Sequence, residues 1–302
     1  MDIGKATAEF NNSGGTWGAI TLTGKIISYQ SDWFSTGTIR VMDSVSVTSE
    51  ADIKNTVERE DNLTGFAIVS FGTLSITGGT VSSISTYAVL NSKPSSVSIS
   101  GGIISGGVYN NDGSVNITGG TVEKTSIVNS LSGAVYNDYE GIVNIAGGTV
   151  ENTGTDAAVW VNSNCPVSIT GGTVSATTGI AVIYTGCSTI TVSGTAKVTS
   201  ANTDTKSGTI YLEASLGTNR AKLVITGGTV ENTSVGTGNA IYNHANLNSM
   251  YYNSPCKVNI TGGTVSKAGN GNYAVYNVNT NKGDVVTIEP GATIVGNKYG
   301  CN

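Results

Sequence analysis

The amino-acid sequence predicts an all-β fold, a right-handed parallel β-helix, and three observations support this prediction. An eight-residue phrase with two central glycines recurs along the chain, a short apolar motif follows each copy, and the spacing between copies is irregular. Repetition at a period of a few tens of residues is typical of a stacked solenoid, in which each repeat buries its apolar face against its neighbours. The repeat therefore indicates one elongated body rather than two globular domains.

The phrase predicts a strand, a corner and a second strand. Its copies occupy residues 74–81, 97–104, 115–122, 143–150, 167–174, 223–230 and 258–265, with a degenerate copy at 190–198. Within one copy, Val115 and Ile117 alternate with Asn116 and Thr118, which is the pattern of a strand with one buried face. The paired glycines permit a turn that a β-carbon would hinder. A second short strand then begins at Thr121.

The motif after each phrase predicts a third strand. In Ala134-Val135-Tyr136-Asn137 and its counterparts, a constant Val or Ile column marks the inward face, so that three strands form a three-sided coil. We expect the amides of the following column to hydrogen-bond to one another and to turn backbone. This column comprises Asn91, Asn110, Asn137, Asn243 and Asn277.

Irregular spacing favours a parallel β-helix over a strict hexapeptide solenoid, because its corners tolerate insertions of different length. First glycines at positions 101 and 119 are 18 residues apart, whereas those at 227 and 262 are 35 apart. The longest insertions, residues 201–220 and 245–255, should form outer loops that can build a site. Alternating segments at both ends bring the total to about eleven coils.

This organisation predicts one β-helix domain over residues 17–302, with residues 1–16 as a cap on its open N-terminal edge. We expect the chain to be a fragment of a larger protein. Its net charge of −5 and its 15 Lys plus Arg provide no basic surface for nucleic acid, and no apolar run is long enough to insert into a membrane.

Cysteine and histidine positions predict neither a metal site nor a cofactor. Cys165, Cys187, Cys256 and Cys301 match no metal-binding or redox spacing, and the only histidine, His244, is expected to lie in a turn. Cys165 and Cys187 should lie on successive coils. A disulfide between them and a pair of buried free thiols both remain open.

The column after the inward Val or Ile is aromatic, and alternation predicts that it points outward. Its members Tyr109, Tyr136, Trp160, Tyr211, Tyr242 and Tyr276 are the predicted ligand-binding residues. Exposed rings at coil spacing would form a stacking platform for sugars or an anchor row for a protein. The alternative is that this stripe is covered or buried.

Carboxylates are the only plausible catalytic groups. Glu123 and Glu151 follow the same valine in adjacent repeats, while Asp112 and Glu140 precede the first strands of those two coils. Stacked in this way they could serve as acid and nucleophile of a glycoside hydrolase, or they could be solvated corner residues. A third hypothesis, ice binding, comes from two hydroxyl-rich columns on the first strand, which include Ser75 and Thr77.

The phrase Val-Asn-Ile-Thr-Gly-Gly-Thr-Val at 115–122, followed by motifs such as Ala240-Ile241-Tyr242-Asn243, resembles the repeats of large cell-surface proteins of gut-type Gram-positive bacteria. The resemblance covers about residues 65–295 and implies an adhesin-like, secreted or surface-attached β-helix that binds glycans or a host glycoprotein. The predicted fold also resembles the pectate-lyase-like architecture of β-helix lyases and hydrolases. We therefore predict an extracellular carbohydrate-binding module rather than an enzyme, with a polysaccharide lyase or glycoside hydrolase as the alternative.

Overall fold

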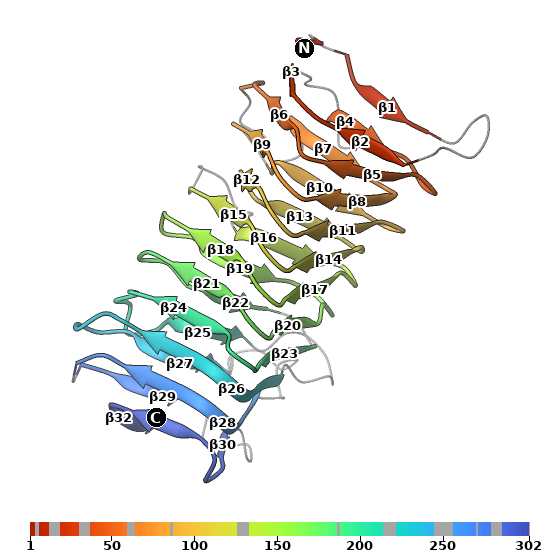
Figure 1. Cartoon of the computed structure of the whole chain (residues 1–302). Coiled ribbons are helices and arrows are strands. Elements are labelled where there is room, and N and C mark those ends of the chain that lie inside the picture. Colours follow the sequence, from red (N-terminus) through yellow and green to blue (C-terminus); the bar gives the residue numbers. More distant parts are fainter. Residues whose placement is uncertain are drawn as a thin grey trace, which may run out of the picture.

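The chain forms a rod of stacked parallel strands (Figure 1). The computed structural model describes residues 1–3, 6–11, 19–29, 37–58, 64–84, 87–125, 133–185, 188–213, 222–244, 256–269, 271–278 and 286–301. All regular elements in these residues are strands, and each neighbouring pair is parallel, as in β14 (Ser114–Ile117) with β17 (Ile142–Ile145). The predicted parallel β-helix is confirmed.

Each coil contributes a first and a second strand to one 20-stranded sheet. The other first strands are β2 (Ile20–Leu22), β5 (Ser46–Ser49), β8 (Thr73–Ile76), β11 (Ser96–Ile99), β20 (Val167–Ile169), β23 (Thr189–Val192), β30 (Val286–Ile288) and the first halves of β26 (Lys222–Asn232) and β28 (Lys257–Lys267). The described residues thus contain eleven first strands, one for each expected coil.

Second strands follow the glycine corner. They are β3 (Lys25–Ser28), β6 (Asp52–Asn55), β9 (Thr80–Ser83), β12 (Ile103–Ser105), β15 (Thr121–Lys124), β18 (Thr149–Asn152), β21 (Thr173–Ala176), β24 (Lys197–Ser200), β31 (Thr293–Val295) and the second halves of β26 and β28. In β26 and β28 the strand runs through the Gly-Gly pair without a break. The phrase therefore folds as strand, corner, strand, with a shallow bend in these two coils.

Third strands form a separate 12-stranded sheet. They are β1 (Ala8–Phe10), β4 (Gly37–Val41), β7 (Phe66–Ser70), β10 (Val89–Ser92), β13 (Val108–Asn111), β16 (Gly133–Asp138), β19 (Ala157–Val161), β22 (Val182–Tyr184), β25 (Gly208–Glu213), β27 (Asn239–His244), β29 (Tyr273–Asn277) and β32 (Asn297–Cys301). Equivalent residues of successive repeats are direct neighbours, so that sequence columns become ladders along the rod.

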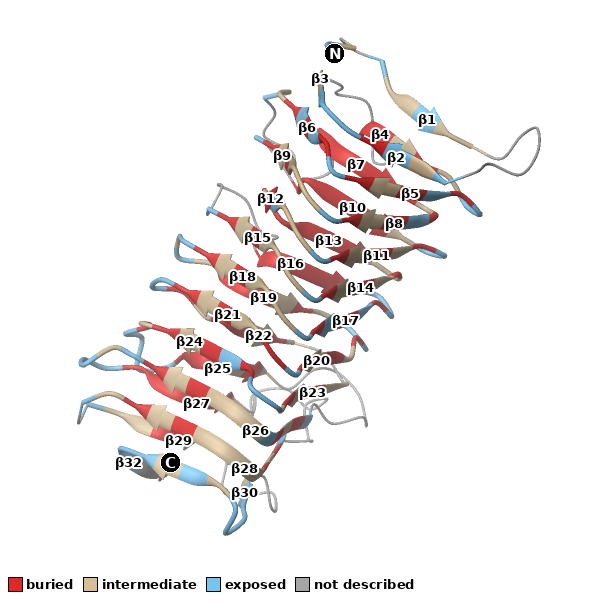
Figure 2. Cartoon of the chain, viewed as in Figure 1, coloured by how far each residue is buried: buried red, intermediate tan, exposed pale blue. Residues whose placement is uncertain are grey.

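The interior of the rod is a continuous apolar core (Figure 2). Val115, Ile117, Val122 and Val135 come from the three sides of one coil, and all are fully buried in the same cluster. Because the strands are in register, each of these positions packs on its counterpart one coil away. Burial of this repeated set is the main stabilising term of the fold.

The asparagine column forms the predicted ladder. Asn91 Nδ2 donates to Asn110 Oδ1 at 2.6 Å, and Asn110 Nδ2 donates to Asn137 Oδ1 at 2.7 Å. Asn137 Nδ2 then donates to the carbonyl of Gly141 at 2.9 Å, which satisfies turn backbone. In the middle of the rod the same column holds Val161, Tyr184 and Leu212, so that the ladder has two separate runs.

The two ends of the rod differ. At the N-terminal end, Ile3 donates its N–H to Ile27 O, and Ile27 donates to Met1 O, so that residues 1–3 pair with the edge of β3. Strand β1 lies within the expected cap segment, yet it pairs with β4 as part of the third-strand sheet. At the C-terminal end, Ile288 and Val295 of the last coil are 40% and 49% exposed. Among the described residues there is no helix that could cross a membrane.

Candidate functional site

The aromatic column lies on the outer side of the third strands but is largely buried. Tyr109, Tyr136 and Tyr242 are only 6%, 4% and 5% exposed, whereas Trp160 and Tyr211 are half-buried. Tyr276 is also half-buried. The expectation of a row of exposed ring faces is therefore wrong for the first three tyrosines, and the alternative of a buried stripe describes them.

The close spacing of the strands explains this burial. Neighbouring strands are about 4.8 Å apart, so that rings in one column lie against one another. The Tyr109 and Tyr136 centroids are 5.2 Å apart in an edge arrangement, while Tyr211 and Tyr242 stack at 5.7 Å with planes 4° apart. Tyr87 covers the column from the side, because its hydroxyl reaches two strands along the sheet to accept from Gly133 N at 3.4 Å.

Glu123 and Glu151 are register neighbours on the outer side of β15 and β18, as the repeat predicts. Both are half-buried. Glu231, in the same column, lies beside Thr199 and Ser266 and so is separate from them. The first two carboxylates are stacked, but the first strand and the glycine corner separate them from Asp112 and Glu140 along the coil. The four carboxylates do not form one site.

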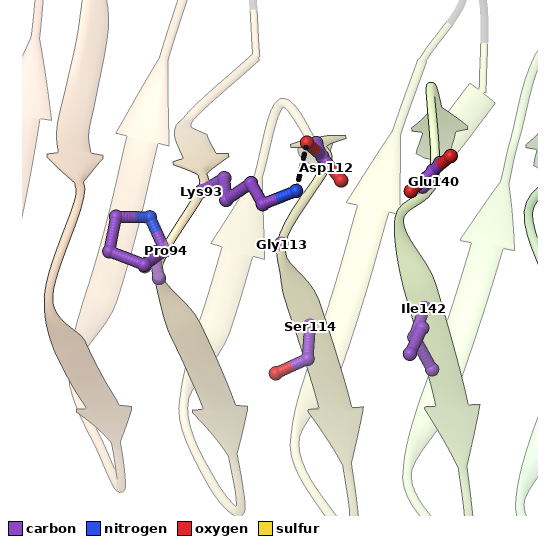
Figure 3. Close-up of a pocket in the computed structure, with 8 residues that line it drawn as sticks. Lys93, Pro94, Asp112, Gly113, Ser114, Glu140 and Ile142 are labelled. Carbon is purple, nitrogen blue, oxygen red and sulfur yellow. Dashed lines mark ion pairs between the residues drawn. The ribbon is translucent and has the colours of Figure 1, made fainter.

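Asp112 and Glu140 line one depression at the corner between the third and first strands (Figure 3). The depression has a volume of about 370 Å³ and crosses three successive coils. Lys93, from the turn between β10 and β11, places its Nζ 3.1 Å from Asp112 Oδ2. Glu140 is exposed on the next coil, and Ile142 supplies an apolar wall that is 44% exposed.

This corner contains unusual backbone conformations. Asp112, Tyr139 and Ser163 have φ values of 64°, 56° and 53°, and they lie at the same corner of three successive coils. Left-handed backbone costs about 1–2 kcal/mol for a residue with a β-carbon, most for bulky side chains, and such strain clusters at functional sites. The turn at Tyr139 leaves its side chain 60% exposed. Tyr139 is thus the open aromatic ring that the aromatic column was expected to provide.

Asp138 organises the polar groups around Tyr139. Its Oδ1 accepts from Tyr139 N at 2.7 Å, Asn162 Nδ2 at 3.1 Å and Ser163 Oγ at 3.2 Å. Its Oδ2 accepts from Tyr136 Oη at 3.5 Å. Burial, followed by the negative charge of Asp138, raises the pKa of Tyr136 to about 12, so this hydroxyl stays protonated.

We call this surface the corner ledge: it consists of Lys93, Asp112, Asp138, Tyr139, Glu140, Asn162 and Ser163. It combines an open aromatic ring, carboxylates, an amide and one ammonium group. Of these residues the sequence reasoning singled out only Asp112 and Glu140. A signal for the others was present, because Asp138-Tyr139-Glu140 falls between repeat motifs, but nothing in it indicates positive φ at a tyrosine.

Cys165 lies directly behind the ledge as a buried free thiol whose Sγ donates to Tyr139 O at 3.0 Å. Burial and the nearby Asp138 raise its pKa to about 12, which keeps it in the unreactive thiol form. Within the described residues Cys165 is thus a free thiol, as in the second of the two alternatives. The expected partner Cys187 lies outside the described residues.

His244 ends β27 and does not join the ledge. Its Nδ1 is 3.2 Å from Tyr211 Oη, and its ring stacks on those of Tyr211 and Tyr242 with centroids 6.0 Å apart. The predicted loop at 245–255 and the end of the loop at 201–220 lie outside the described residues. Among the residues that the structure does describe, no group of three or more His, Cys, Asp or Glu could hold a metal ion.

The hydroxyl-rich columns proposed for ice binding lie in register but are interrupted. Asn116 continues to Asn144, whose Nδ2 donates back to Asn116 Oδ1 at 2.9 Å, and Val224 breaks the same column further along. A further threonine column on the second strand, which includes Thr121 and Thr149, was not part of the prediction. Asn144 and Val224 thus interrupt the hydroxyl columns, and ice binding stays a prediction.

Comparison with known proteins gives no relative to guide the assignment: no family model matches the chain, and neither a curated protein nor a solved structure matches it.

Proposed function

We propose that the chain is a glycan-binding module of an extracellular bacterial surface protein, and that the corner ledge is its binding site. The observation that carries the proposal is Tyr139, which is 60% exposed, beside the carboxylates of Asp138 and Glu140. An open aromatic face packs against the apolar face of a sugar ring. Carboxylate and amide groups at its edge accept and donate hydrogen bonds to sugar hydroxyls, which fixes orientation.

The ledge is also prepared for binding before any ligand arrives. Asp138 already holds Asn162 and Ser163 by hydrogen bonds, and the backbone of Tyr139 is fixed by its bond to Asp138 Oδ1. Groups held in place lose little conformational freedom on binding, so more of the contact energy appears as affinity. A glycan on a host glycoprotein or a dietary polysaccharide would present the same chemistry.

Tyr139→Ala should weaken glycan binding about fivefold or more, because an aromatic anchor at the centre of a site contributes about 1–3 kcal/mol. A glycan array with the wild-type chain first identifies a ligand, and titration calorimetry then compares variants on it. Glu151→Gln is the matched control, since Glu151 is half-buried on a different side of the coil. Unchanged affinity in Tyr139→Ala, or an equal loss in Glu151→Gln, would remove the ledge as the site.

A polysaccharide lyase or glycoside hydrolase is the second candidate, and the shared depression of Asp112 and Glu140 favours it. Two carboxyl groups can act as acid and nucleophile or base, and Lys93 adds a cation beside them. If the ledge is catalytic, the chain will release reducing ends or unsaturated products from a panel of neutral and acidic polysaccharides. Asp112→Asn and Glu140→Gln should each abolish that release. Binding without any product release in the wild-type chain would exclude this candidate.

A further inference from the structure

A second kind of site lies where the second strands end and each coil turns toward its third strand. This corner is different from that of the ledge. The column there is buried and inward-facing, and apart from Ala176 the members that carry it are polar: Ser28, Asn55, Ser83, Lys124, Asn152, Ser200, Asn232 and Lys267. Asn55, Ser83, Asn232 and Lys267 donate to backbone carbonyls. Asn232 Nδ2, for example, donates to the carbonyls of Asn202 and Asn239 at 2.9 Å each. The chain thus uses side-chain donors to satisfy carbonyls that the turns leave inside the rod.

Lys267 fills this role with an ammonium group, whose pKa burial lowers. Lys267 is 3% exposed, and its Nζ donates to three backbone carbonyls. These belong to Ser234, Ala268 and Gly236, the last at 3.0 Å. Two of these oxygens belong to the turn after β26 and the third follows Lys267 itself. All hydrogen-bond partners that the described residues give this ammonium are carbonyl oxygens, and none is a carboxylate. Within the described part of the chain, the charge is thus balanced by oriented peptide dipoles.

Backbone carbonyls that converge on a desolvated monovalent charge are the coordination chemistry of an alkali-cation site. We propose that the carbonyls of Ser234, Gly236 and Ala268 form a binding site for a monovalent cation of the potassium class, which the ammonium of Lys267 occupies. The chain supplies its own cation, and its fold therefore does not depend on potassium. This site is independent of the proposed glycan-binding function, because the ledge lies at the other end of the third strands and on different coils.

Lys124 provides a matched control within the same column. It is 5% exposed, but its Nζ lies 3.5 Å from the centroid of the Tyr87 ring and is supported by the face of that ring. An aromatic face attracts a cation without offering oxygen lone pairs that converge on it. Removal of Lys124 should therefore leave no site that potassium can fill, whereas removal of Lys267 should leave three carbonyls without a donor.

The test compares thermal unfolding of Lys267→Met and Lys124→Met in potassium chloride and in choline chloride of equal ionic strength. We expect Lys267→Met to melt several degrees below the wild-type chain in choline chloride and to regain about half of that loss or more in potassium chloride. For Lys124→Met, the melting temperature should be the same in potassium chloride as in choline chloride. The same should hold for the wild-type chain. Crystals of Lys267→Met soaked in rubidium chloride should show anomalous scattering between the three carbonyls.

Either of two outcomes with the methionine variants overturns the proposal. One is equal melting of Lys267→Met in the two salts, and the other is an equal potassium response in Lys124→Met, which would reveal a general salt effect. If Lys267→Met does not fold in either salt, Lys267→Gln provides the test instead. Its shorter amide can donate to only some of the three carbonyls, so this variant should show a smaller potassium response. No response in that variant also overturns the proposal. Glycan binding at the ledge should be the same in every folded variant.

Discussion

Gly148→Ala is expected to lower the free energy of unfolding by about 3–5 kcal/mol, which is at the upper end for a single substitution. Gly148 has φ of +69°, where a β-carbon meets the preceding backbone. A β-carbon there would also lie 2.6 Å from Gly119 O and 2.7 Å from Gly120 O, both on the adjacent coil. Those atoms are backbone in a stacked ladder, and they cannot move without separating the two coils.

Gly78→Ala is the control for this effect. A β-carbon at Gly78 would approach nothing closer than 3.8 Å, with Glu50 as its nearest neighbour, and Gly78 is the first rather than the second glycine of its pair. We expect this variant to lose about 1 kcal/mol or less. Urea denaturation followed by circular dichroism measures both. Similar losses in the two variants would show that close approach between coils does not explain the glycine pairs.

The fold could be predicted from the sequence because each constraint in it is local and repeats. Alternation fixes which side of each short strand is buried, and the glycine pair fixes where the chain must turn against the neighbouring coil. Once successive repeats are stacked, equal positions become neighbours, as for Glu123 beside Glu151 and for the amides of Asn91 and Asn110. Insertions of different length do not disturb this register, since they leave the rod at the corners.

The candidate site could be predicted only in part, because it depends on properties that do not repeat. Alternation correctly placed Tyr109 and Tyr136 outside the core, but it carries no information about how neighbouring rings cover one another. Tyr139 belongs to no column. Its exposure follows from a positive φ, which sequence composition does not reveal for a tyrosine. Asp112 and Glu140 were found because they precede equivalent strands, whereas Lys93 joins them only through contact across coils.

Because of the buried tyrosines, the free energy of unfolding should fall steeply in alkaline solution. Tyr87, Tyr109 and Tyr136 form an apolar cluster outside the main core together with Phe66, Val69 and Leu90. Burial raises the pKa of Tyr87 and Tyr109 above the ordinary value, and burial with the charge of Asp138 raises that of Tyr136 to about 12. In the unfolded chain tyrosine ionises near pH 10.

The sign follows from proton binding. Above about pH 10 the unfolded chain releases phenolic protons that the folded chain retains, so stability falls as pH rises. Each tyrosine that resists ionisation costs about 1.4 kcal/mol per pH unit, and three of them together cost about 4 kcal/mol per unit between roughly pH 10 and 12. Tyr87→Phe should reduce this slope by about 1.4 kcal/mol per pH unit, the contribution of one proton. Chemical denaturation across the pH series measures the slope.

Lys124 acts in the opposite direction below that range. Burial lowers its pKa to about 8, against the smaller opposing effect of Asp156, so that from about pH 8 to 10 the unfolded chain holds a proton that the folded chain has lost. Stability should therefore rise through this interval and reach its maximum near pH 10, before the tyrosines reverse the trend. Lys124→Met should reduce the rising limb, to which the lowered pKa of buried Lys267 also contributes, and leave the alkaline fall intact. A flat profile above pH 10 in the wild-type chain would mean that solvent already reaches the tyrosine hydroxyls, and that the outer aromatic column is an open surface after all.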